Sequence, residues 1–411
     1  MPLQDPYQAL RFREYRYFLV GAVALTMASQ MQTLVMGWQV YAITRDPLSL
    51  GLIGLSEAVP FLGLCLIGGY AADRMDRRSL SMMALAVLLL GALLLVLLNL
   101  GSGLGLASRA VWPFYAIQAL AGVGRAVYRP ASQALGTELV PLEAYQNAAT
   151  WRGSSFEVAQ LVGPSVGGLI LGFGSAATAY LVELVFMLIA LVAMCLVAPR
   201  PRPPLKQTRL LRNLGEGVGF VFGHRLLLGS MSLDLFAVLF GGAVALLPVF
   251  ASEILKVGPE GLGLLRTAPA VGSVLMGLWL AHHPPQNRAG LVLLACVAGF
   301  GLCWIGFALS WSFWLSMTVL AVSGALDNVS VVLRNTLLQT QTPPEMMGRV
   351  QAVGGFFIGS SNELGGFESG LAARLLGVIP SVLFGGCMTL GVVGFITWKV
   401  PELRRLRTMF K

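Results

Sequence analysis

The sequence predicts an all-α integral membrane protein with twelve transmembrane helices in two pseudo-symmetric six-helix bundles. Of its 411 residues, 56% are hydrophobic and only 11% are charged, whereas soluble domains carry roughly 25% charged residues. Apolar stretches long enough to cross a bilayer recur along the whole chain, and Lys and Arg gather in every second connection between them. This composition excludes a soluble enzyme of this length.

Twelve apolar stretches, found with a window of about 19 residues, predict the helices in order. An even number of spans places both termini on the same side of the membrane. The predicted spans are 17–44, 48–72, 80–99, 110–130, 146–172, 176–197, 226–251, 261–281, 289–310, 312–335, 350–373 and 378–398.

The basic residues predict the orientation. Of the 28 Lys and Arg residues, 23 lie at the termini and in the even-numbered connections. The positive-inside rule therefore predicts a multi-pass protein of the inner (cytoplasmic) membrane, with both termini in the cytoplasm. No basic run with interleaved aromatic residues occurs, so the net charge of +9 predicts contact with the lipid bilayer and no nucleic-acid partner.

The longest connection divides the chain into two halves. We expect an N-terminal bundle at 1–197, a cytoplasmic linker with an amphipathic helix at 198–225, a C-terminal bundle at 226–399 and a cytoplasmic tail at 400–411. A weak repeat supports the halves, because Gly163 and Gly168 are matched 202 positions later by Gly365 and Gly370. Such a repeat is typical of transporters that alternate access to a midplane site.

The connection after the second span reads Gly-Tyr-Ala-Ala-Asp-Arg-Met-Asp-Arg-Arg from Gly69. It resembles the loop signature of the major facilitator superfamily, with Asp76 where the superfamily usually has a second glycine. The resemblance implies a cytoplasmic gate in which Gly69 allows close helix approach and the acid pairs with arginines; the alternative is that the arginines only anchor the loop. The expected gate residues are Gly69, Asp73, Arg74, Arg77 and Arg78.

The fifth span contains Gly163-Pro164-Ser-Val-Gly167-Gly168. This run resembles the superfamily's Gly-Pro motif, which is associated with proton-driven exporters, although small-residue packing alone also produces such spacing. Pro164 is expected to kink the helix, and the glycines to allow tight packing.

In the fourth span the superfamily's arginine position is occupied by Gln118, so its proton-relay role does not carry over.

Longer matches narrow the resemblance to one branch. The run Gly-Val-Gly-Arg-Ala-Val-Tyr-Arg-Pro from Gly122 and the run Pro-Pro-Glu-Met-Met-Gly-Arg-Val from Pro343 resemble the branch of enterobactin exporters, macrolide efflux carriers and transmembrane secretion effectors. The resemblance covers most of the chain. It implies the major facilitator fold.

Ionisable residues inside the predicted spans are costly and are therefore candidate functional residues. They are Glu57, Arg125, Arg152, Glu157, Glu183, Asp234, Asp327, Glu363 and Glu368. We expect proton coupling by one or more of five carboxyls, with Asp234 first: Asp234, Asp327, Glu157, Glu57 and Glu363. The alternative is structural: hydrogen-bonded packing, or ion pairs with Arg125, Arg152, Arg266 or Arg334. Asp327 and Asn328 also offer oxygen ligands for sodium.

Amide and aromatic side chains are the candidates for a substrate cavity, because the first and seventh helices line the path in the fold that the resemblance implies. Helical spacing prevents all of them from facing one cavity. The candidates are Gln30, Gln32, Trp38, Gln39, Phe236, Phe240 and Asn328.

These observations predict a secondary active transporter, a proton-coupled exporter (antiporter) of an amphipathic small molecule such as a drug or siderophore. The alternatives are a sodium-coupled carrier or importer of a small organic solute and a non-transporting membrane receptor. The five cysteines lack metal-ligand spacing, and no catalytic or phosphate-binding motif occurs. We therefore expect a monomer without cofactor, metal or enzymatic activity, whose partners are its substrate and protons or sodium.

Overall fold

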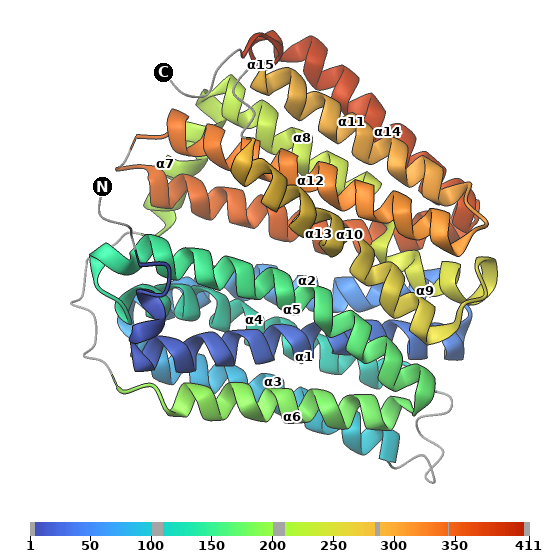
Figure 1. The fold of residues 1–411 in the computed structure, drawn as a ribbon, viewed down its shortest axis with the longest axis horizontal. Helices are drawn as coiled ribbons and strands as arrows, with labels where there is room; N and C mark the ends of the chain where they lie inside the picture. Colours follow the sequence, from blue (N-terminus) through green and yellow to red (C-terminus); the bar gives the residue numbers. More distant parts are fainter. Residues whose placement is uncertain (1–4, 101–109, 200–209, 284–287, 344, 407–411) are drawn as a thin grey trace. The chain divides into compact units, whose positions relative to one another are not determined.

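The computed structural model describes residues 5–100, 110–199, 210–283, 288–343 and 345–406. Within these ranges all the regular structure is helical (Figure 1). The main helices are α1 (Arg13–Thr44), α2 (Pro47–Arg74), α3 (Arg77–Leu100), α4 (Trp112–Glu138), α5 (Tyr145–Phe173), α6 (Ala176–Cys195), α7 (Leu210–Gly223), α8 (Arg225–Gly241), α10 (Gly258–His282), α11 (Ala289–Ala308), α12 (Phe313–Gln341), α13 (Met347–Leu376) and α14 (Val378–Lys399). Short helices complete them: η1 (Ala9–Arg11), η3 (Leu142–Ala144), η4 (Ala243–Leu246), α9 (Leu247–Val249), η5 (Phe250–Ile254) and α15 (Pro401–Arg405).

Each predicted span coincides with one of these helices or, for 226–251, with the run from α8 to η5, so the predicted all-α membrane fold is confirmed. Ten helical stretches of the described chain are long and apolar enough to cross a membrane. The other two predicted spans, 110–130 and 350–373, correspond to α4 and α13.

The seventh span is broken because its sequence interrupts the helical hydrogen-bond ladder. The pair Gly241-Gly242 ends α8, and Gly242 lies outside the helical region at φ −92° and ψ 59°. Pro248 then starts a new turn, since its missing N–H is not needed at a helix start. The π-helical segment η5 completes the span.

The chain forms two compact units, residues 1–45 with 56–207 and residues 46–55 with 208–411. In the first unit α1 packs against α5 and α6, and α3 packs against α4 and α6 (Figure 1). In the second unit α12 packs against α10 and α11, and α14 packs against α8 and α11. Each unit thus has its own core: Tyr15, Phe18 and Phe114 are fully buried in the first, and Trp304 and Phe307 in the second.

Glycines allow the closest helix contacts, as expected where lipid offers no hydrophobic driving force between helices. In the first unit a side chain at Gly68 would collide with the Ala126 carbonyl, and one at Gly122 with the Glu57 carbonyl. Both contacts join α2 to α4.

Three further features complete the fold. The η1 segment is tied to α5, because the amide of Ala9 donates to Asn147 Oδ1 at 2.9 Å. The helix α7 occupies the stretch for which an amphipathic helix is predicted; the linker residues 200–209 and the tail residues 407–411 lie outside the described ranges. All five cysteines are free, and two of them are exposed, Cys195 in α6 and Cys387 in α14.

Candidate functional site

A buried acid and arginine pair links α2 to α4 in the first unit. The Glu57 side chain is 8% exposed and forms an ion pair with Arg125. Gln118 Nε2 donates a hydrogen bond of 2.5 Å to the other oxygen of the same carboxylate. Gln118 and Arg125 are seven residues apart, two helical turns, and so lie on one face of α4. Gln118, which stands at the superfamily's arginine position, therefore donates a hydrogen bond to the same carboxylate that Arg125 neutralises.

Amide side chains of α1 tie the first unit together. Gln39 Nε2 donates to Asn99 Oδ1 of α3 at 2.7 Å, and its Oε1 accepts from the Tyr180 hydroxyl of α6 at 3.0 Å. Gln30 Nε2 donates to Gln160 Oε1 of α5 at 2.9 Å. Both glutamines, predicted as cavity residues, thus hold helices of their own unit.

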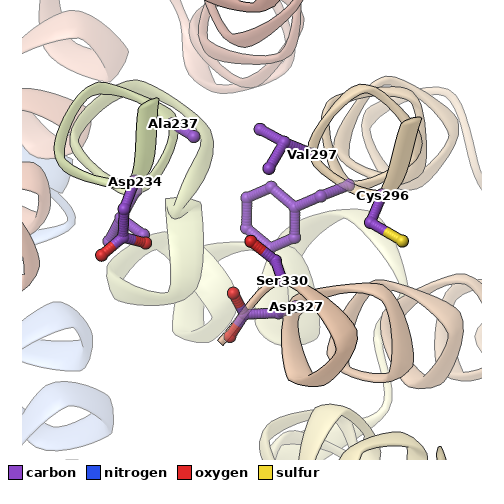
Figure 2. Close-up of a pocket in the computed structure, with 8 residues that line it drawn as sticks. Asp234, Ala237, Cys296, Val297, Asp327 and Ser330 are labelled. Carbon is purple, nitrogen blue, oxygen red and sulfur yellow. The ribbon is translucent and has the colours of Figure 1, made fainter. Parts of the chain in front are cut away.

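A second acid and arginine pair lies in the second unit. Asp234 of α8 forms an ion pair with Arg334 of α12, and the two side chains are only 11% and 12% exposed. Beside this pair is a cavity of about 10 Å³, which is about the room that one water molecule needs. Figure 2 shows Asp234 and Asp327 bordering this cavity from two different helices, together with Ser330. The apolar part of its wall comes from Ala237, Val238, Cys296, Val297 and Phe300.

The remaining cavity candidates do not line this space. Phe236 and Phe240 stack on each other along α8 with their ring centres 6.3 Å apart. Asn328 Nδ2 donates to Ser273 Oγ of α10 at 2.9 Å. Gln32 is buried, and Trp38 is half-buried. The structure therefore does not gather the predicted cavity residues at one place within either unit.

The five predicted proton carriers fall into four groups. Glu57 and Asp234 are ion-paired, as the structural alternative predicts. Asp327 borders the cavity, whereas Glu157 is half-buried in α5 and has no ion pair or hydrogen bond within the described residues. Glu363 lies in α13, but its side chain falls outside the described part of the structure.

The predicted gate loop needs one correction. Within the described residues no atom lies within 4 Å of a Cβ built at Gly69; the close approach occurs one residue earlier, at Gly68, which faces α4. The helical register explains the shift, because only one of two neighbouring residues can face a given helix.

The loop's charged residues form local contacts inside the first unit. Arg77 pairs with Glu138 of α4 at 2.5 Å, and Arg78 donates to the Cys195 carbonyl of α6 at 2.9 Å. The Arg74 guanidinium lies 4.2 Å from the centre of the Tyr70 ring. Asp73 is exposed and has no ion pair among the residues that the structure describes. The expected pairing of Asp73 with arginines across the cytoplasmic interface stays a prediction.

Asp76, which departs from the superfamily pattern, begins α3. Its carboxylate accepts hydrogen bonds from the Ser79 amide at 2.9 Å and the Ser79 hydroxyl at 2.5 Å, which is N-terminal capping. Partial burial acts to raise the pKa of the Asp76 carboxyl, but these hydrogen bonds, one from the Arg78 amide and the Arg78 charge together lower it below its usual value. Asp76 therefore replaces a flexible glycine with a fixed helix start.

The glycines of the fifth span pack α5 against α1. A Cβ at Gly163 would lie 2.9 Å from the Gln30 Cβ, and one at Gly167 would lie 3.3 Å from the Met31 Cα. Gly168 is also buried. Pro164 lies inside α5, which continues as one helix from 145 to 173.

Glu183, the only charged residue of α6, was among the candidate functional residues of the predicted spans but not among the five expected proton carriers. This side chain is 1% exposed, and neither of its carboxylate oxygens has a hydrogen-bond partner in the described residues. Its place as a lone acid within a continuous apolar run is the signal that could have added it to the expected proton carriers. Likewise, hydropathy does not show which of several arginines pairs with Asp234. Among the described residues no group of three His, Cys, Asp or Glu side chains could hold a metal ion.

Comparisons with known proteins agree with this architecture. The chain is 27% identical to the enterobactin exporter EntS of Shigella flexneri over 380 residues, which are 90% of this chain and 87% of that one. The match to EntS of Escherichia coli O1:K1 has the same identity and coverage. Among solved structures, the POT family transporter PepTSo superposes with a TM-score of 0.76 at 13% identity, covering 96% of this chain and 99% of that one. A D-xylose-proton symporter superposes with a TM-score of 0.71 at 17% identity, covering 96% and 99%.

These relatives and structural neighbours are transporters, and none is an enzyme. The family model described as transmembrane secretion effector matches residues 4–408. The chain therefore belongs to the transmembrane secretion effector family and is a membrane transporter of the major facilitator type.

Proposed function

We propose that the protein is a secondary active exporter that moves an amphipathic small molecule, such as a siderophore or drug, out of the cytoplasm in exchange for protons. The observation that carries this proposal is the similarity to an enterobactin exporter over 90% of the chain. We place both termini in the cytoplasm, because Lys and Arg concentrate on that side of the predicted spans. The protein lies in the inner membrane as a monomer. Transport proceeds by alternating access between the two units.

Buried acid and arginine pairs support protons as the coupling ion. Each unit holds one such pair, Glu57 with Arg125 and Asp234 with Arg334. Protonation of the acid removes the charge that holds the arginine, so the occupancy of one proton changes which contacts join two helices. An ion pair at these positions is therefore compatible with proton coupling.

One observation favours sodium as the second candidate. Asp234, Asp327 and Ser330 bring oxygen atoms to a cavity of about 10 Å³. Oxygen atoms are the ligands that hard cations prefer. Sodium at this place would substitute for the proton on Asp234.

Flux through proteoliposomes tests the proposal. The purified protein is reconstituted, and uptake of enterobactin and of a panel of lipophilic drugs is measured under a pH gradient, a sodium gradient or neither. We expect flux that follows the pH gradient and that falls by at least about tenfold in Asp234→Asn. The matched control is Glu345→Gln, which removes an exposed carboxylate from the same unit.

The outcomes separate the alternatives. Flux driven only by sodium would replace the proton with sodium. Flux into the compartment that corresponds to the cytoplasm would make the protein an importer. Binding without flux under any gradient would contradict transport and favour a receptor.

A further inference from the structure

Glu183 is the one charged residue of α6, and it lies in the interior of the first unit. Its side chain is 1% exposed, and both carboxylate oxygens lack hydrogen-bond partners within the described residues. A carboxylate in a dry site without donors is far less stable than the neutral acid, because nothing replaces its lost hydration. The geometry thus favours the protonated form of Glu183 in this conformation.

Arg125 of α4 is the cation that interacts electrostatically with Glu183 among the described residues. One of its terminal nitrogens, Nη1, pairs with Glu57. The other, Nη2, is buried and has no hydrogen-bond partner in the part of the chain that is described. The guanidinium therefore has an unused donor in the same interior that holds an unpaired carboxyl.

The other helices packed against α6 carry their charged side chains away from the position of Glu183. The helices packed against α6 are α1, α3 and α5. The charged residues of α1 and α3 lie only in their first turns, and α5 carries Arg152 and Glu157 in its first half, whereas α6 follows the end of α5. Tyr180, one turn before Glu183, is buried and donates its hydroxyl to Gln39. Arg125, which pairs with Glu57, is therefore the cation whose charge acts on Glu183 among the described residues.

We propose that Glu183 is a proton-binding site that exchanges Arg125 with Glu57. In this conformation Arg125 neutralises the Glu57 carboxylate, and Glu183 holds the proton. In the alternate conformation Glu57 takes up a proton, Arg125 moves to Glu183, and the Glu183 carboxyl releases its proton. Each state contains one guanidinium, one carboxylate and one neutral acid, so the interior stays neutral while one proton is bound and one is released.

The link between this exchange and transport rests on the proposed function, but the protonation of Glu183 is measured without transport. Infrared spectroscopy of the full-length protein in liposomes records the carbonyl band of protonated carboxyls at neutral pH. We expect Glu183→Gln to remove one such carboxyl from the band. Glu143→Gln, which removes an exposed carboxylate of the first unit, leaves the band unchanged.

A second variant tests the exchange with Glu183 in place. Glu57→Gln frees Arg125, and we expect Arg125 to pair with Glu183 and to ionise it, so the same band is lost although Glu183 is intact. If the band survives in both Glu183→Gln and Glu57→Gln, the proposal is overturned. Because the two variants change different helices, misfolding of one leaves the other as the test.

Flux then separates this proposal from the proposed function. We expect Glu183→Gln to lose pH-driven flux by about tenfold or more while substrate counterflow, which needs no net proton movement, stays within about twofold. Full pH-driven flux in Glu183→Gln overturns the exchange and leaves proton-coupled export standing. Loss of the infrared band in both variants, together with no pH-driven flux in the intact protein, supports the proton site and contradicts proton-coupled export.

Discussion

In the first unit Gly122 of α4 lies against the carbonyl of Glu57 in α2, and in the second unit Gly324 of α12, 202 positions later, lies against the carbonyl of Pro269 in α10. The residue three positions after each glycine is charged, but the sign differs: Arg125 in the first unit and Asp327 in the second. The same close helix contact therefore occurs in both units, with a positive residue beside it in the first unit and a negative residue in the second.

The partner helices show the same reversal. Glu57 lies three residues before Pro60 of α2, and Arg266 lies three residues before Pro269 of α10. Glu57 and Arg125 form an ion pair, whereas Arg266 has no ion pair or hydrogen bond within the described residues, and Asp327 borders the cavity beside Asp234. The two halves thus share backbone contacts, whereas the polar side chains beside these contacts differ.

The largest expected difference concerns the two arginines. Arg125→Leu leaves the buried Glu57 carboxylate without its cation, and we expect a loss of about 3–5 kcal/mol in the free energy of unfolding. Arg266→Leu removes a charge that has no partner among the described residues, so stability stays equal or rises. Thermal unfolding in detergent measures both. Equal losses in the two variants would contradict the asymmetry, and the double variant Glu57→Leu with Arg125→Leu is the control that should recover most of the loss.

A double-mutant cycle sharpens the comparison in the second unit. Asp234→Asn, Arg334→Gln and their combination should give a coupling energy of about 2 kcal/mol, because the two side chains share one buried ion pair. The same cycle between Asp327 and Arg266 should give a coupling near zero. Unfolding free energies of the four proteins in each cycle provide the measurement, and a coupling of similar size in both cycles would mean that Arg266 pairs with Asp327.

The glycine contacts should behave alike in both units. We expect Gly122→Ala and Gly324→Ala each to lower the unfolding free energy by about 2 kcal/mol, because the added methyl group meets a backbone carbonyl. Gly153→Ala and Gly391→Ala are the matched controls, since no described atom lies within 4 Å of a Cβ at either position. A clear difference between Gly122→Ala and Gly324→Ala would show that the repeat does not extend to the backbone.

The smallest effect concerns the turns that follow α2 and α10. In the first unit Asp76 caps α3, whereas in the second unit α11 starts after Arg288, at φ 57°, without a side-chain cap. Asp76→Ala should cost about 1 kcal/mol, and Asp76→Gly a little less. Because the pKa of Asp76 is lowered in the folded state, its contribution is present above the ordinary value of 3.8 and is lost as the pH falls through the lower folded value. Melting temperatures of Asp76→Ala and the intact protein should therefore converge below about pH 4; a constant difference would contradict capping by the carboxylate.

Hydropathy was sufficient to predict the helices. The predicted spans 146–172 and 378–398 differ from α5 and α14 by at most one residue at each end. The break at Gly241 was not predicted, because the residues on both sides of it are equally apolar. The helices α4 and α12 extend past their predicted ends at 130 and 335, to Glu138 and Gln341. Hydropathy misses these last turns because their residues are polar although they are helical.

The partners of the buried charges could not be predicted in the same way. Helical periodicity shows which residues share a face, but not which neighbouring helix covers that face or at what height. This is why Arg125 was not assigned to Glu57, why the close approach was placed at Gly69 instead of Gly68, and why Gln39 was expected in a cavity although it bonds to Asn99 and Tyr180.

The free cysteines allow the motion of the two units to be measured with attached labels. Each unit has one exposed thiol, Cys195 on α6 and Cys387 on α14, while Cys65, Cys296 and Cys303 are partly or fully shielded. The native chain therefore already carries one accessible attachment point for a membrane-permeant spin label or fluorophore on either side of its repeat. A distance recorded between two such labels would follow opening and closing without any engineered residue.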